Sequence, residues 1–371
     1  MAKSLDQKAL RAELDKIPVT WEMDESNPVV QMTEDERVRM LGFNPPPGTM
    51  SISEAAEAHL AAPTVTPDSI TAEMNIGAPV KFDQRDIGGK NFTTSVKNQG
   101  GCGSCVAFGT IGVLETTYQR QTNKSNSGID LSEAHLFYCH GGEDGRKCST
   151  GWFPEPAFKK ARDKGIATED KYPYTGLQQA CAVTSGWQNS KASSTGHSKL
   201  STRTAMKNWI ATRGSITGCF VVFQDFFSYS SGVYRHVTGN SAGGHCVEIC
   251  GYDDTQACWI CKNSWGTSWG EAGYFRIGYG QCNIENWAGP YGSTGVSMRS
   301  WQSDKRVAGL WSNDSERNAW VHLSGVGWNR LQNNNASTQH AMLIELTGAR
   351  ARGRRVNALI DKGEVQELYV I

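Results

Sequence analysis

The sequence predicts an α+β fold for most of its 371 residues. Two observations support this prediction. Some segments place apolar side chains every three or four residues, which is typical of amphipathic helices. Other, shorter segments are rich in β-branched and aromatic residues, which is typical of strands. A chain that mixes both patterns along its length indicates an α+β architecture.

The charge balance excludes several classes of partner. The chain carries 37 basic and 37 acidic side chains, so no overall field favours nucleic acid or a membrane surface. No segment approaches the roughly 18 consecutive apolar residues of a membrane-spanning helix. Residues 1–78, which we call the leader, hold 6 Lys and Arg against 13 Asp and Glu. The leader therefore has a net charge of −7, and the rest of the chain has +7.

The leader contains three segments with helical patterns, at residues 7–16, 33–43 and 52–62. Prolines interrupt these segments, namely Pro45, Pro46, Pro47, Pro63 and Pro67. This composition suits a segment that lies on the surface of another domain better than one with its own core. The N-terminus also lacks the apolar stretch of a signal peptide.

Residues 79–300, which we call the body, supply the main α+β pattern. A helix is predicted over residues 105–121, with apolar side chains at Val106, Phe108, Ile111, Leu114 and Tyr118. Strands are predicted within residues 215–223, 246–253, 257–265 and 273–279.

Residues 301–371, which we call the tail, predict a small β-rich domain of unknown role. Residues 318–328 alternate like half-buried strands, and residues 337–353 have a helical pattern. Residues 354–371 predict a hairpin that turns near Lys362 and Gly363. The Trp-rich and Asn-rich segments suit carbohydrate or protein recognition and equally suit core and loops, so the ligand of the tail is left open.

Cys105 is the first candidate for chemistry. It stands at the start of the helix predicted over residues 105–121, directly after a glycine-rich turn. Unpaired amides and the helix dipole at such a position favour an anion and lower the pKa of a thiol. Cys102, inside the turn, is better placed to brace the loop through a disulfide.

A nucleophilic thiol also needs a base and a group that orients the base. His245 stands 140 residues after Cys105, and Asn263 follows 18 residues later, both in β-rich segments. Each of the three residues alone is more often structural. Their order and spacing together favour nucleophilic catalysis.

Several ordered motifs resemble the papain-like cysteine proteases over residues 80–289. These motifs are QGGCGSC, LSEAHLFYC, CSTGW, YPYTGLQQAC, GGHCVEICGYD, KNSWGTSWGEAGYFRIGYG and CNIENW. The resemblance implies a papain-like fold with a helical lobe and a β-barrel-like lobe. It further implies a cysteine endopeptidase for protein or peptide substrates, made as a zymogen that its own leader inhibits, without a cofactor or a metal.

The resemblance also assigns roles to individual residues. It implies Cys105 as the nucleophile, His245 as the general acid and base, Asn263 as the orienter of the imidazole, and Gln99 as an oxyanion donor. Trp265 would shield the bond between His245 and Asn263 from water. The resemblance also implies a peptide-binding cleft in which the backbone of Gly151 binds an extended substrate. Trp152 and Phe153 would form the wall of the S2 pocket, and Gly243 and Gly244 would open its other side.

The sequence contains 11 cysteines, so complete pairing must leave one thiol free. The resemblance implies the disulfides Cys102–Cys148 and Cys139–Cys181. Its assignments leave open the pairing of Cys219, Cys246, Cys250, Cys258, Cys261 and Cys282. The Cys258 and Cys261 pair looks like half a zinc site, but no second matched pair exists, so we expect no metal. Cysteine usage favours a secreted or otherwise extracytoplasmic protein, while the missing signal peptide leaves a cytoplasmic location open.

The sequence departs from the family pattern at three places. Val106 replaces the tryptophan that usually follows the nucleophile, Thr150 replaces a glycine of the substrate-binding loop, and Glu248 lies in a segment that is usually apolar. Two alternatives therefore stay open: a Cys-His acyltransferase or transpeptidase on the same fold, and a catalytically weak binding protein.

We expect the leader to be released at low pH as its carboxylates are protonated, with processing between Thr71 and Phe82.

Overall fold

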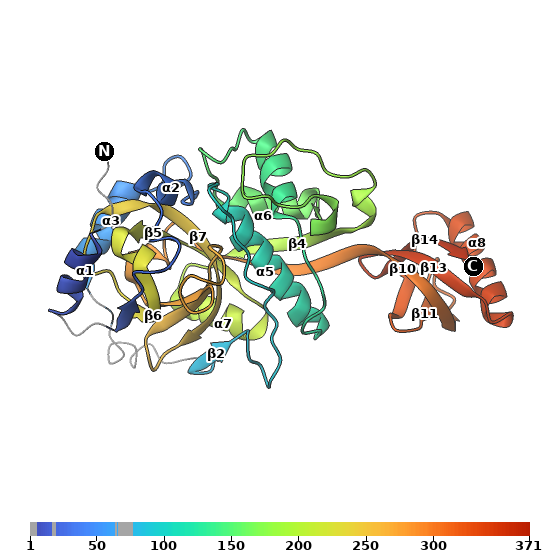
Figure 1. Cartoon of the computed structure of the whole chain (residues 1–371). Helices are drawn as coiled ribbons and strands as arrows, with labels where there is room; N and C mark the ends of the chain where they lie inside the picture. Colours follow the sequence, from blue (N-terminus) through green and yellow to red (C-terminus); the bar gives the residue numbers. More distant parts are fainter. Residues whose placement is uncertain (1–5, 17–19, 64, 66–76) are drawn as a thin grey trace.

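The computed structural model describes residues 6–16, 20–63, 65 and 77–371. The α+β prediction is confirmed, because helices and strands alternate throughout the body (Figure 1). The helices are α1 Gln7–Leu14, α2 Glu34–Arg39, α3 Ile52–Ala61, α5 Cys105–Thr122, α6 Pro154–Asp163, α7 Arg203–Thr212 and α8 Ala336–Ala351, with a π-helix η2 His135–Gly141 and the 3-10 helices η3 Glu169–Lys171, η4 Trp187–Asn189, η5 Gln224–Ser228 and η6 Gln281–Asn283. None of the helices in the described ranges is both long and apolar enough to cross a bilayer.

The strands form two sheets. Their bounds are β1 Trp21–Met23, β2 Lys81–Asp83, β3 Ile166–Ala167, β4 Lys191–Lys199, β5 Ile216–Phe223, β6 Tyr229–Tyr234, β7 Ser241–Asp253, β8 Cys258–Lys262, β9 Tyr274–Gly278, β10 Tyr291–Ser312, β11 Ala319–Leu323, β12 Gly327–Leu331, β13 Arg355–Asp361 and β14 Glu364–Val370. The first sheet has the order β1-β6-β9-β8-β7-β2, with β5 paired to β7. The second has the order β11-β12-β14-β13-β10-β4-β3.

Helix α5 lies between a helical lobe and the first sheet. It packs against α6 on one side and against β7 and β5 on the other. Because it is enclosed in this way, almost every side chain of its first three turns is buried, polar ones included. Strand β7 runs through the first sheet and pairs with β5, β8 and β2, so its side chains are also buried along most of its length. The interface between the two lobes thus brings α5 against β7.

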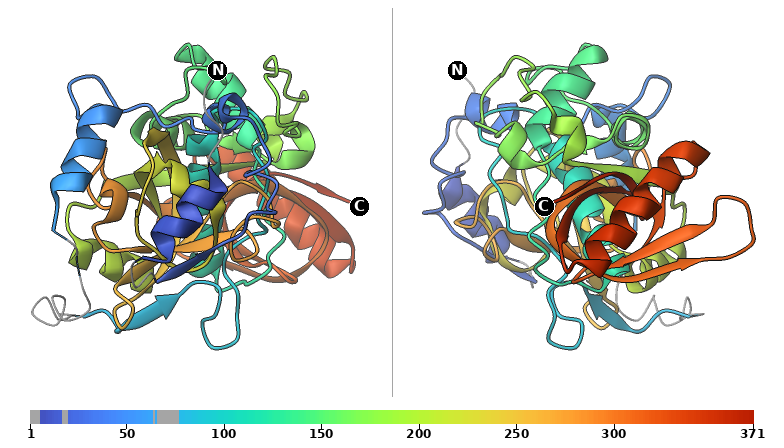
Figure 2. Two further views of the ribbon diagram at one scale, coloured as in Figure 1. Left: turned by 60° about the vertical axis from the view of Figure 1, so that its left-hand side comes forward. Right: turned by 90° about the vertical axis from the view of Figure 1, so that its right-hand side faces the viewer.

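The tail is joined to the body by β10, a strand of 22 residues. Its first part pairs with β4 up to Arg299, and its second part pairs with β13 from Ser300 onward. Figure 1 and the right view of Figure 2 show the tail as a sheet with α8 on one face. The hairpin between β13 and β14 turns where predicted, because Lys362 and Gly363 both have positive φ, at 52° and 77°.

The leader packs on the body rather than forming a core of its own. Its apolar side chains, including Leu10, Trp21 and Phe43, belong to the same apolar cluster as the body. Helices α1, α2 and α3 lie within the three predicted segments. Strand β1 was not predicted, because its three residues form a strand only by pairing with β6 of the body.

Candidate active site

Cys105 is the first residue of α5, as the sequence predicted. The turn before it is held by the Cys102–Cys148 disulfide and by a hydrogen bond of 3.1 Å from the Gly103 N–H to the Cys148 carbonyl oxygen. The Cys105 sulfur is fully buried and accepts a hydrogen bond from the backbone N–H of Cys246, the residue after His245. The fold therefore brings the start of α5 against the part of β7 that carries His245.

His245 and Asn263 form the expected pair. The distance between His245 Nε2 and Asn263 Oδ1 is 2.8 Å, and both side chains are buried. The Trp265 ring lies 4.8 Å from the His245 ring, between centroids. His245 Nδ1 has no hydrogen-bond partner among the described residues. One ring nitrogen is thus held by the amide, and the other is left unpaired.

Gln99 is fully buried beside the turn that precedes Cys105. Its Oε1 accepts a hydrogen bond of 2.6 Å from Ser264 Oγ, which sets the orientation of the side-chain amide. Its Nε2 donates to the Cys102 carbonyl oxygen at 2.7 Å and to the Met40 carbonyl oxygen at 2.9 Å. The predicted oxyanion donor therefore binds a peptide carbonyl of the leader.

Leader residues 41–44 lie in the cleft. The Phe43 N–H donates to the Gly244 carbonyl oxygen at 3.0 Å, and the Asn44 N–H donates to the Trp152 carbonyl oxygen at 3.0 Å. The Trp152 N–H in turn donates to the Gly42 carbonyl oxygen at 2.8 Å. Backbone hydrogen bonds on both walls thus hold the leader as they would hold a peptide.

Gly42 lies beside Cys105. Its backbone N–H donates to the Cys105 sulfur. A Cβ atom at position 42 would lie 1.9 Å from the Gly103 carbonyl oxygen, so only glycine allows the leader backbone this close to the turn that precedes Cys105.

Burial decides the protonation of the covered site. It raises the pKa of the Cys105 thiol, and it lowers the pKa of His245 to about 4, although the hydrogen bond to Asn263 opposes this shift. Both groups are therefore neutral between about pH 4 and the ordinary thiol range. The predicted lowering of the thiol pKa is wrong for this state, because loss of solvent outweighs the helix dipole.

The leader shares the cleft with three of the predicted substrate-binding glycines. A pocket of about 420 Å³ in the cleft is lined by Gly151, Gly243 and Gly244, and by Leu41 and Phe43 of the leader, among others. The expected aromatic wall is not part of this lining. The Trp152 ring is fully buried, where it packs against Gly141, and the Phe153 ring lies under the Arg146 guanidinium.

Two disulfides join the pairs implied by the resemblance, Cys102–Cys148 and Cys139–Cys181. The other seven cysteines are free and buried, and they include Cys258 and Cys261 on β8. The described part of the chain contains no group of three or more His, Cys, Asp or Glu side chains that could hold a metal ion.

Sequence reasoning missed two features of the site. The first is the leader segment 40–44, for which Gly42 between two apolar residues is the only local signal. The second is the partner of Glu248, because that carboxylate pairs with Lys262, 14 residues later on the neighbouring strand. Both contacts are made by residues that are distant in sequence.

Comparisons with known proteins agree with this geometry. A family profile described as "Papain family cysteine protease" matches residues 78–289. The chain is 35% identical over 215 residues to a "Cathepsin L-like proteinase" of Fasciola hepatica, which covers 57% of this chain and 63% of that protein. It is 34% identical over 214 residues to "Thiol protease aleurain" of Arabidopsis thaliana, covering 56% of this chain and 58% of that protein.

Solved structures show the same fold. The structure titled "proCathepsin B S9 from Trypanosoma congolense" aligns with a TM-score of 0.64 at 23% identity, covering 79% of this chain and 99% of that chain. A digestive procathepsin L2 proteinase from Tenebrio molitor larval midgut aligns with a TM-score of 0.58 at 27% identity, covering 77% of this chain and 88% of that chain. The two-lobed fold expected from the sequence is thereby confirmed.

Proposed function

Because the chain belongs to the papain family of cysteine proteases, we propose that it is a cysteine endopeptidase made as an inhibited zymogen. Cys105 is the nucleophile, His245 is the general acid and base, and Asn263 orients the imidazole. The pair of His245 and Asn263, joined at 2.8 Å, supports these roles. The unpaired Nδ1 of His245 is then the atom that exchanges a proton with the thiol.

Release of the leader starts the reaction. Solvent and substrate enter the cleft, and the burial that holds both groups neutral is relieved. The proton of Cys105 passes to His245 Nδ1, and the resulting thiolate is stabilised by the N-terminus of α5 and by the imidazolium. The thiolate then attacks the carbonyl carbon of the scissile peptide bond.

The oxyanion that forms binds to two N–H donors, the backbone of Cys105 and Nε2 of Gln99. One such donor is typically worth about 3–4 kcal/mol of transition-state stabilisation. His245 gives its proton to the leaving amine, which departs. It then takes a proton from a water molecule that hydrolyses the thioester and restores Cys105. Trp265 keeps water away from the hydrogen bond that holds the imidazole during these steps.

The leader acts as an intramolecular inhibitor. The observation that best supports this role is the hydrogen bond of 2.9 Å between Gln99 Nε2 and the Met40 carbonyl oxygen, because it occupies the proposed oxyanion donor. The Gly42 N–H at the Cys105 sulfur blocks the nucleophile in the same way. A substrate can bind only after these contacts are broken.

The leader also indicates the substrate preference. The Leu41 side chain lies against Gly243, and the Phe43 ring contacts the Trp287 ring edge-on at 4.6 Å between centroids. A peptide with large apolar side chains would fill the space that these two residues leave. We therefore expect an apolar residue to be favoured at P2 over a charged one, because an unpaired buried charge is costly.

The proposed place of action is extracytoplasmic, because the two disulfides require an oxidising environment to form and persist. The ligand of the tail stays open, although Trp311, Trp328 and Tyr369 are exposed there.

The test uses the full chain. It is purified at neutral pH, shifted to pH 4–5, and assayed with a fluorogenic peptide that carries a large apolar P2 residue, with and without a competing amine. We expect little activity before the shift, hydrolysis after it, and no activity in Cys105→Ala. Activity of the uncut chain at neutral pH would refute inhibition by the leader. Products formed mainly with the amine would instead indicate acyl transfer.

A further inference from the structure

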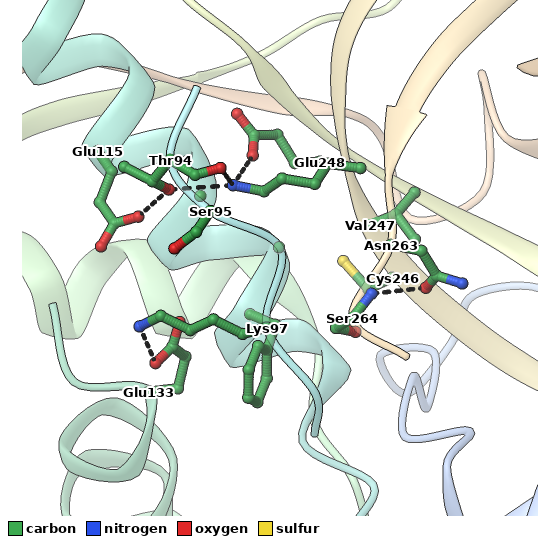
Figure 3. A pocket seen from close by; sticks show the side chains of 14 residues that line it. Thr94, Ser95, Lys97, Glu115, Glu133, Cys246, Val247, Glu248, Asn263 and Ser264 are labelled. Carbon is green, nitrogen blue, oxygen red and sulfur yellow. Dashed lines mark hydrogen bonds and ion pairs between the residues drawn. The ribbon is translucent and has the colours of Figure 1, made fainter. Parts of the chain in front are cut away.

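A buried carboxylate lies behind the proposed catalytic groups. Glu248 stands on β7 three residues after His245, and its side chain is 1% exposed. Its Oε1 accepts a hydrogen bond of 2.6 Å from Thr116 Oγ1 on α5. Its Oε2 lies 2.8 Å from Lys262 Nζ at the end of β8. Figure 3 shows Glu248 in a small pocket with Thr94, Glu115 and Asn263.

Helix α5 is built to admit this carboxylate. A Cβ atom at Gly112 would lie 2.4 Å from Glu248 Oε2, so any larger residue at position 112 would collide with the carboxylate. Gly112 and Thr116 are four residues apart and lie on the same face of α5. One of them leaves room for Glu248, and the other donates a hydrogen bond to it.

The same contacts connect the three elements that carry the proposed catalytic groups. Glu248 belongs to the strand of His245, and it is bonded to the helix that begins with Cys105. Its partner Lys262 directly precedes Asn263, and Lys262 Nζ also donates to Thr94 Oγ1 at 3.1 Å. Glu248 is therefore bonded to α5 and to β8 at once, from within β7.

The charged and titratable groups near Glu248 and Lys262 come from several elements. Lys262 is approached by Glu248 and, through Thr94, by Glu115 on α5. Glu115 is also near Lys97, which pairs with Glu133 at 2.8 Å and with Asp130 at 2.6 Å. Further ionisable groups that interact with Glu248 or Lys262 are Tyr274 on β9, Cys250 on β7 and Cys261 on β8. Removal of the charge of Glu248 would leave a buried ammonium without its closest counterion.

We propose that Glu248 is a positioning residue, which sets His245 and Asn263 against Cys105 by pairing with Lys262 and by accepting the hydrogen bond of Thr116. This inference rests on the proposed function. It deepens that function by assigning a role to a carboxylate that lies outside the reacting atoms.

The first test is Glu248→Gln, which keeps the size of the side chain and removes its charge. It is measured in the acid-activated full chain, with rates normalised to the sites that a covalent epoxide probe titrates. We expect kcat to fall about 10–100-fold with little change in KM, because misplacement of catalytic groups impairs chemistry rather than binding. The alkaline limb of the kcat/KM profile should also move to lower pH by about one unit, since the unpaired ammonium disfavours the imidazolium.

Asp254→Asn is the matched control. Asp254 is also a buried carboxylate paired with a buried lysine, at 3.0 and 2.8 Å from Lys207 Nζ, but it lies beyond the far end of β7. This variant should lower the melting temperature and leave the pH profile unchanged. An equal shift of the profile in both variants would show a general loss of stability and would overturn the proposal.

Thr116→Val tests the hydrogen bond of Glu248 without changing a charge, and it tests the proposal if Glu248→Gln does not fold. It removes the hydrogen bond to Glu248 and keeps both charges, so we expect a lower kcat with an unmoved alkaline limb. Unchanged kcat in Thr116→Val would overturn the proposal while leaving the proposed function intact. The function itself would fail only if Cys105→Ala kept its activity.

Discussion

His59 offers a direct test of how acid releases the leader. It lies on α3, is 8% exposed, and its Nδ1 accepts a hydrogen bond of 3.1 Å from the backbone N–H of Cys282. Its ring centroid is 6.0 Å from that of His236, whose Nδ1 lies 3.1 Å from Asp225. A proton on Nδ1 of His59 would break the bond to Cys282 and place a positive charge in an apolar contact between leader and body.

The size of the pH effect on leader binding follows from the pKa of His59. Burial, together with the nearby His236, lowers the pKa of His59 from its ordinary value of 6.5 to about 4, although Asp225 opposes this shift. This fall in pKa corresponds to a difference of about 3 kcal/mol between the free energies with which the neutral and the protonated leader dock. A group with a lowered pKa in the bound state favours docking at neutral pH, and the benefit is lost as pH falls from 6.5 through 4. The leader should therefore bind roughly a hundredfold more weakly at pH 4 than at pH 7 through this residue alone.

The assay follows activation of the purified full chain against pH, by hydrolysis of a fluorogenic peptide. His59→Asn places an amide oxygen near the position of Nδ1 and does not titrate, so its activation at pH 4–5 should slow by more than tenfold. His340→Asn is the control, because His340 is exposed on α8. If His59→Asn activates with an unchanged pH dependence, the reasoning is refuted and protonation of the leader carboxylates becomes the better explanation.

Three further predictions concern the leader, the buried carboxyls and the disulfides. Gly42→Ala should make the uncut chain active at neutral pH, because its Cβ would lie 1.9 Å from the Gly103 carbonyl oxygen and prevent docking; an inactive variant would contradict this. Burial raises the pKa of the coupled carboxyls of Glu115 and Glu133 to about 7, so the stability that they contribute is lost as pH rises through 7. The melting temperature of Cys105→Ala should therefore be lower at pH 8 than at pH 6.5, and Glu115→Gln should flatten this dependence. Cys139→Ser removes the Cys139–Cys181 disulfide and should lower the free energy of unfolding in urea by about 4 kcal/mol, because that disulfide closes a loop with a separation of 42 residues. A decrease of less than about 1 kcal/mol would contradict this argument from loop entropy.

Local patterns in the sequence were enough for several helices and strands, and residue order and spacing were enough to name a candidate triad. The apolar spacing after Cys105 predicts α5 and its start on a thiol, and the turn chemistry at Lys362 and Gly363 predicts the last hairpin. The order of Cys105, His245 and Asn263 indicates that the fold brings them together. The predictions of the helix and the hairpin succeed because helix periodicity and turn conformation are properties of short segments.

Only the tertiary structure decided how the site is covered and charged. Leader segment 40–44 lies in the cleft through backbone hydrogen bonds, which leave almost no trace in side-chain identity. The helix N-terminus alone would lower the pKa of Cys105, yet burial by distant segments raises it. The sequence around Glu248 gives no partner for its charge, and only the fold brings Lys262 and Thr116 beside it from other elements. Burial and pairing depend on contacts between residues far apart in the chain, and these contacts exist only after the lobes and the leader have packed together.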